Sequence, residues 1–163
     1  MGWFLIHLCK LNHGTPEAAS CMKMALEAIE GSLVLGWDAQ YGGGILYMMD
    51  VLDKPIADAT VTATNKLWWP HAEALYALTL AYTETRDARF LGWLERVHAY
   101  VYEHFVDSVE RGGHGEWYGY LDRQGAVFNR CKGGNYKGCF HVPRALLFSY
   151  QTAAAFLSAE NPT

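Results

Sequence analysis

Two similar segments of this chain lie 70 residues apart, and this internal repeat constrains the fold more than any other feature. Each segment contains a Lys, aromatic residues and then a His near the start of an expected helix, and the two histidines are His71 and His141. Two expected helices and a glycine-rich hairpin precede each segment. Units of this kind stack into an α-solenoid or close into an α/α toroid, in which the loops at one end carry the chemistry.

Hydrophobic spacing and helix-capping residues predict five helices. They are expected at residues 2–11, 16–35, 70–85, 87–105 and 141–158, with hairpins at 36–47 and 115–127 and loops at 53–65 and 130–139. Thr15 is expected to cap the second helix, and Pro16 suits its first position. Gln124 and Gly125 are expected to form the turn of the second hairpin.

The first expected helix is apolar on nearly every side, which predicts that it is buried all round. Its apolar residues are Trp3, Phe4, Leu5, Ile6, Leu8 and Leu11. No capping residue precedes it, and natural domains rarely open in the middle of a buried helix. We therefore expect upstream sequence to be missing. The alternative is that Met1 begins a short first helix.

Composition and charge exclude several classes of protein. The chain has 163 residues, 51% of them hydrophobic, which is typical of one globular domain or a piece of one. With a net charge of −4 and no basic run, it is not expected to bind nucleic acid or an anionic membrane surface. The apolar start is too short to span a membrane. The four cysteines lack CxxC spacing, which predicts reduced thiols in a cytoplasmic protein and no metal site.

The residues around the two histidines suit the recognition of a sugar. Indole rings stack on the apolar C–H face of a sugar, while charged groups bond its hydroxyls. A histidine at a helix N-terminus tends to stay neutral and able to accept a proton. The candidate site residues are His71, His141, Trp68, Trp69, Lys66, Glu73, Glu116 and Arg144.

These residues also have structural alternatives. A histidine at a helix start is often a capping or packing residue, Trp68 and Trp69 could belong to the core, and Glu73 could be a solvated first-turn acid. A different enzyme is a further alternative, because Glu73 and Glu116 could be the paired carboxylates of a glycoside hydrolase on an α/α toroid. No GxGxxG, P-loop or GxSxG motif is present.

Three blocks of the sequence resemble the N-acylglucosamine 2-epimerase family, known in mammals as renin-binding protein. The blocks are KLWWPHAEA (66–74), GEWYGYL (115–121) and KGCFHVPR (137–144). The resemblance runs from Gly2 to about Tyr150. It implies an all-α fold, a partial (α/α)6 barrel, or α/α toroid, with short β-hairpins in the connecting loops. Residues 1–163 would be the C-terminal part of one epimerase domain whose N-terminal half is absent, and such an open arc should expose apolar side chains.

The resemblance also implies a reaction, the interconversion of N-acetylglucosamine and N-acetylmannosamine by removal and return of the proton at C2. It assigns proton transfer to His141, an active-site carboxylate to Glu73 and a pocket position to His71. The family's second proton-transfer histidine lies in a Pro-Gly-His-x-x-Glu block, which is expected just before Gly2 and is absent here. No redox cofactor or metal is required, and a nucleotide such as ATP is expected to be an effector rather than a reactant.

The partners implied by the resemblance are an amino-sugar substrate, a second copy of the chain in a homodimer, and a renin-like protein. A non-catalytic protein-binding fragment and an aldose–ketose isomerase are the alternatives to an epimerase. Because the five expected helices form only an open arc of the barrel, we expect the chain alone to be weakly folded, aggregated or dependent on a partner, and inactive.

Overall fold

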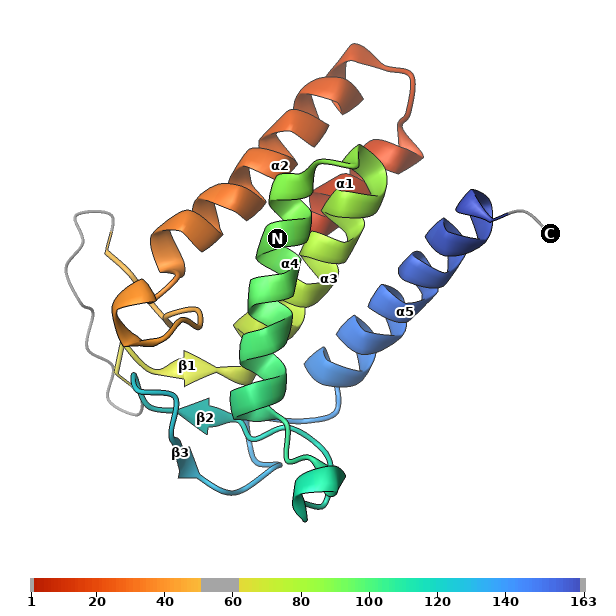
Figure 1. Ribbon diagram of the computed structural model, residues 1–163. Helices are drawn as coiled ribbons and strands as arrows, with labels where there is room; N and C mark the ends of the chain where they lie inside the picture. Colours follow the sequence, from red (N-terminus) through yellow and green to blue (C-terminus); the bar gives the residue numbers. More distant parts are fainter. Residues whose placement is uncertain (1, 51–61, 162–163) are drawn as a thin grey trace.

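The computed structural model describes residues 2–50 and 62–161, and within them the chain is mostly helical (Figure 1). Its helices are α1 (Gly2–Leu11), α2 (Pro16–Gly36), α3 (Trp68–Thr85), α4 (Ala88–Tyr100) and α5 (His141–Glu160). A π-helical segment, Val101–Phe105, extends α4. These bounds confirm the predicted helices to within a few residues. The predicted loop at 53–65 lies mostly outside the described residues.

Side-chain caps explain where α2 and α4 begin. The Thr15 hydroxyl accepts a hydrogen bond from the amide of Ala18, 3.1 Å away, and Pro16 takes the first helical position. The Asp87 carboxylate caps α4 by accepting from the amide of Arg89 at 2.9 Å. Both starts agree with the prediction, because a cap depends on residues that are close in the sequence.

Among the described helices, α1, α3 and α5 lie side by side and run in the same direction. Residues further along one helix contact residues further along the next. The contacts are Trp3–Glu73 and Lys10–Glu84 between α1 and α3, and Glu73–Arg144 and Arg86–Glu160 between α3 and α5. Helices α2 and α4 run back beside α1 and α3, to which short turns join them (Figure 1). This alternation of two helix rows is the expected arrangement of an arc of an α/α barrel.

Helix α3 forms the middle of this arc and carries much of its core. Since α1, α4 and α5 all pack against α3, its buried residues cover several of its faces. The hydrophobic spacing that predicts the helix at 87–105 is confirmed, because Phe90 and Val97 on α4 and Val101 and Phe105 on its π-helical extension are all buried. The core therefore lies between the two rows of helices.

The outer edges of the arc leave apolar side chains exposed. On α1 they are Phe4, Leu8 and Leu11, and on α5 they are Leu147, Tyr150 and Leu157. This confirms the expectation for an open arc. The prediction that the first helix is buried all round is wrong, because α2 and α3 cover only the side that holds Ile6 and Cys9.

A small antiparallel sheet lies next to the start of α3 (Figure 1). Within the described residues its strands are β1 (Lys66–Leu67), β2 (Tyr120–Leu121) and β3 (Val127–Asn129), paired in the order β1-β2-β3. Strands β2 and β3 form the predicted second hairpin, and Gly125 adopts a left-handed conformation in its turn, with φ of 86°. The pairing of β1 with β2 was not predicted, since it joins segments far apart in the sequence.

The internal repeat is visible in the segments that follow α2 and α4. In the first, Trp37 forms an isolated β-bridge with Ile45 around a short 3-10 turn that ends at Gly42, with φ of 77°. In the second segment Val106 forms a bridge with Trp117, and the 3-10 turn between them ends at Gly112, with φ of 80°. The first predicted hairpin is therefore a single bridge around a turn rather than a pair of regular strands.

Candidate active site

Glu73, in the second turn of α3, accepts hydrogen bonds from both neighbouring helices. From α1, the Trp3 indole Nε1–H donates to Oε2 over 2.7 Å. From α5, His141 Nδ1 lies 2.7 Å from Oε1, and the Arg144 guanidinium donates to the same oxygen. An ionised carboxylate can only accept, so Nδ1 of His141 carries the proton. One carboxylate thus connects the N-terminal parts of three parallel helices.

His141 is the first residue of α5 and remains partly open to solvent. Its side chain is 31% exposed, and its ring leans against Trp69 with the ring centroids 5.9 Å apart. With its Nδ1 proton directed at Glu73, the neutral ring has its lone pair on Nε2. No side chain or backbone group of the described residues is hydrogen-bonded to Nε2. The ring therefore presents a free basic nitrogen beside an orienting carboxylate.

Arg144, one turn further along α5, lies between two aromatic rings. Its guanidinium carbon is 5.0 Å from the ring centroid of Trp3 and 4.2 Å from that of Phe140. These cation–π contacts add to the ion pair with Glu73 and restrict the guanidinium to one position. Arg144 therefore supports the carboxylate that orients His141.

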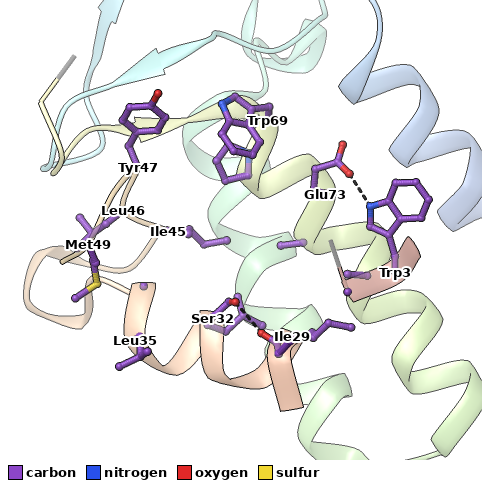
Figure 2. Close-up of a pocket in the computed structure, with 17 residues that line it drawn as sticks. Trp3, Ile29, Ser32, Leu35, Ile45, Leu46, Tyr47, Met49, Trp69 and Glu73 are labelled. Atoms are coloured by element: carbon purple, nitrogen blue, oxygen red, sulfur yellow. Dashed lines mark hydrogen bonds between the residues drawn. The ribbon is translucent and has the colours of Figure 1, made fainter. Parts of the chain in front are cut away.

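A pocket of about 500 Å³ opens beside Glu73 (Figure 2). Trp3 and Glu73 line one part of it, Trp69 and Tyr47 line another, and mostly apolar residues of α2, of α3 and of residues 45–49 line the rest. Glu73 is the one charged residue among the described residues that line it. Aromatic and apolar walls with few polar groups are typical of small-molecule sites. Trp69 is 37% exposed, so part of this residue is accessible to solvent, and its stacking role stays a prediction.

His71 lies in the interior rather than in the pocket, which corrects the role expected for it. It is fully buried, its Nε2 accepts from the amide of Ile45 at 2.8 Å, and its Nδ1 donates to the carbonyl of Leu67 at 2.6 Å. Burial lowers the pKa of His71 to about 3, so the ring stays neutral. Both ring nitrogens are hydrogen-bonded within the fold, so His71 is the packing residue that was the alternative to a functional role.

Lys66 and Trp68 are also buried, so neither is placed to contact a substrate as expected. The Lys66 ammonium lies 3.7 Å from Asp38 and donates to the carbonyls of Tyr41 and Arg123, at 3.3 and 2.6 Å. Burial lowers the pKa of Lys66, although the Asp38 carboxylate opposes this shift. Lys66 therefore ties β1 to two loops, while Trp68 is 3% exposed and belongs to the core.

Glu116 makes its contacts away from Glu73. It lies in the loop before β2, where its carboxylate accepts from the amide of Trp117 at 2.6 Å and lies 3.2 Å from the Lys137 ammonium. These contacts give no support to Glu73 and Glu116 as the paired carboxylates of a hydrolase. They also leave the expected substrate contact of Glu116 without structural support.

Trp3 belongs to the site although sequence reasoning did not select it. In the sequence it appears only as one member of an apolar run. The signal available was its indole N–H, because a partly buried Trp usually needs a hydrogen-bond acceptor for this group. No local pattern identifies that acceptor, since Glu73 lies on another helix.

Residues 2–50 and 62–161 contain neither a metal-binding cluster nor a membrane-spanning helix. Within these residues, no cluster of three or more His, Cys, Asp or Glu side chains is placed to hold a metal ion. None of the helices described there is both long and apolar enough to cross a membrane. The cysteines are free thiols, with Cys9 buried and Cys131 and Cys139 exposed.

Known proteins resemble this chain along nearly its whole length. N-acylglucosamine 2-epimerase from Homo sapiens is 36% identical over 165 residues, which cover 99% of this chain and 35% of the human protein. The Bos taurus protein of that name is 35% identical over 174 residues, which cover 99% of this chain and 38% of the relative. This chain therefore spans little more than a third of the length of these relatives.

Solved structures with a similar fold are also sugar enzymes. A cellobiose 2-epimerase from Spirochaeta thermophila matches with a TM-score of 0.69 and 22% identity, over 96% of this chain and 36% of that one. A D-mannose isomerase matches with a TM-score of 0.67 and 21% identity, over 93% of this chain and 35% of that one. At this identity the likeness shows the fold, and it confirms the expected α/α-barrel type.

A family model gives the assignment directly. The model described as N-acylglucosamine 2-epimerase (GlcNAc 2-epimerase) matches residues 1–145, which include the helices that carry Trp3 and Glu73 and the start of α5 with His141 and Arg144. The match covers most of the chain and agrees with the curated relatives. The chain belongs to the N-acylglucosamine 2-epimerase family.

Proposed function

We propose that this chain supplies one side of the active site of a sugar 2-epimerase that interconverts N-acetylglucosamine and N-acetylmannosamine. The observation that carries the proposal is the arrangement of His141. Its ring is partly exposed, its Nδ1 is hydrogen-bonded to Glu73, and its Nε2 has no partner among the described residues. Relatives of this chain are named N-acylglucosamine 2-epimerase, which supports the choice of substrate.

In the proposed reaction the sugar first opens to its aldehyde form. Nε2 of His141 then removes the C2 proton, and the electron pair of the broken C–H bond forms a C1–C2 double bond while negative charge gathers on O1. A proton returned to the opposite face of C2 gives the epimer. No electrons are gained or lost overall, so the step requires no redox cofactor, and acid–base groups are sufficient without a metal.

Glu73 and Arg144 are proposed to prepare His141 for this step. The Glu73 carboxylate fixes the tautomer in which Nε2 is the base, and it stabilises the imidazolium that forms when Nε2 takes the proton. Arg144 is proposed to hold the Glu73 side chain in place through their ion pair. Trp69, which is 37% exposed and lies beside His141, is proposed to stack on the sugar. Glu73 is thus the orienting carboxylate rather than a second base.

Epimerisation needs a second acid/base group on the other face of C2. His71 does not fill this role because it is buried and hydrogen-bonded at both nitrogens. We therefore propose that the 163-residue chain exchanges the C2 proton but epimerises far more slowly than a full-length relative. A nucleotide effector, a homodimer and a renin-like partner stay predictions from the family resemblance, and a cytoplasmic location stays a prediction from the cysteine pattern.

Deuterium exchange at C2 tests the proposal. N-acetylmannosamine and N-acetylglucosamine are incubated in deuterated water with the chain, and loss of the C2 proton signal is followed by NMR. We expect exchange above the buffer rate, and we expect His141→Ala to abolish it. His114→Ala is the matched control, because His114 is an exposed histidine on a loop.

Two results would contradict the proposal. One is exchange that persists unchanged in the His141→Ala protein, since another group would then be the base. The other is a wild-type chain that shows helical circular dichroism and yet exchanges no faster than buffer. Turnover close to that of a full-length relative would instead overturn the expectation that the chain lacks a second acid/base group.

A further inference from the structure

Trp3 contacts both charged groups that support His141. Its indole Nε1–H donates to Glu73 Oε2 over 2.7 Å, and the guanidinium carbon of Arg144 lies 5.0 Å from the centroid of its ring. Trp3 is the second residue of α1, whereas Glu73 is on α3 and Arg144 is on α5. One side chain thus connects the first of the three parallel helices to the polar groups of the other two. Figure 2 shows its hydrogen bond with Glu73.

The contact with Trp3 divides the two oxygens of Glu73 between different partners. Oε2 is occupied by the indole N–H, while Oε1 receives both the His141 Nδ1–H and Arg144. A guanidinium beside a carboxylate prefers two parallel hydrogen bonds, one to each oxygen. Without the indole donor, Oε2 would become free for Arg144. The carboxylate would then turn toward the guanidinium and move Oε1 away from His141.

We propose that Trp3 is a positioning residue of the proton-transfer site, whose indole N–H holds Glu73 in the rotamer that fixes the His141 tautomer. This inference rests on the proposed function for its catalytic meaning, but its structural content does not need turnover. Trp3 acts through Glu73 and touches no reacting atom. Its effect should therefore appear in the protonation pattern of the His141 ring.

A packing role for Trp3 predicts a different result. The Trp3 ring also packs against Tyr76 and His7, with centroids 5.4 and 5.9 Å apart. If packing were its whole contribution, a ring of similar shape would replace it without changing His141. Trp3→Phe keeps an aromatic ring and removes the N–H, so it separates the two roles.

The test is the ¹⁵N NMR spectrum of the His141 ring at a pH where the ring is neutral, with His141→Ala used to assign the signals. In the wild-type chain we expect the proton mainly on Nδ1. In Trp3→Phe we expect the ratio of Nδ1–H to Nε2–H tautomers to fall about tenfold, as for the loss of one hydrogen bond to a charged group. Trp93→Phe is the matched control, because Trp93 also has an Arg guanidinium 5.0 Å from its ring, that of Arg96.

A second measurement covers the case in which Trp3→Phe does not fold. The indole N–H signal of Trp3 in the Glu73→Ala protein, which has no side-chain acceptor at position 73, should shift toward that of a solvent-exposed indole, while the Trp93 signal stays in place. An unchanged tautomer ratio in folded Trp3→Phe, or an unmoved indole signal in Glu73→Ala, would overturn the inference. If His141→Ala leaves C2 exchange intact while Trp3→Phe still changes the tautomer, the proposed function fails and the positioning role stands.

Discussion

Acidification should destabilise this protein through His71. Its ring is fully buried, and both of its nitrogens are used, one as acceptor from the amide of Ile45 and one as donor to the carbonyl of Leu67. A proton added at Nε2 would remove the acceptor and place a charge in the core. Burial therefore lowers the pKa of His71 from 6.5 to about 3.

The sign and size follow from these two pKa values. Below pH 6.5 the unfolded chain takes up a proton at His71 that the folded chain refuses, so stability that is present above pH 6.5 is lost progressively as the pH falls toward 3. Within this window, each unit by which the pH falls lowers the free energy of unfolding by about 1.4 kcal/mol. Between pH 7 and pH 5, His71 alone should lower the free energy of unfolding by about 2 kcal/mol.

Urea unfolding at pH 7, 6 and 5, compared between the wild-type chain and His71→Gln, measures this contribution. Glutamine can still accept from one backbone group and donate to the other, but it does not titrate. All other groups titrate in both proteins, so the difference between the two free energies isolates His71. We expect wild type to lose about 2 kcal/mol relative to His71→Gln on going to pH 5. Parallel pH dependences of the free energies of unfolding of the two proteins would refute the reasoning. His114→Gln, at an exposed position, is the control and should follow the pH dependence of the wild-type chain.

Three further predictions follow from buried or strained positions. Asp38→Ala should destabilise the chain by about 3–5 kcal/mol in urea unfolding, because it leaves the buried Lys66 ammonium without its counter-charge; a loss under 1 kcal/mol would show that this pair is dispensable. Burial raises the pKa of the Cys9 thiol to about 11, so at pH 8 mass spectrometry should find it alkylated last and the exposed cysteines first. Gly44→Ala should lower the melting temperature clearly more than Gly42→Ala. Both glycines have positive φ, but only at Gly44 would a Cβ lie 2.6 Å from the buried ring of Tyr100. Equal melting temperatures of the two variants would contradict this.

Local sequence was sufficient to predict the helices, and the family resemblance selected two residues of the candidate site. Thr15 and Asp87 cap their helices through backbone amides two or three residues away, so their effect can be predicted without a tertiary structure. The family blocks placed His141 and Glu73 together, and the structure brings these two side chains into contact. The distance of 70 residues between similar segments likewise predicted a repeated helical architecture.

Residue types and near neighbours are enough to predict which segments are helical and which side chains are candidates for acid–base chemistry. The packing of the helices in three dimensions buries His71 and leaves His141 partly exposed, although both follow the same local pattern. The same packing brings Trp3 into contact with Glu73, which lies 70 residues further along the chain. Burial and hydrogen-bond partners are set by helices that pack against a residue from distant parts of the chain, and no local pattern contains that information.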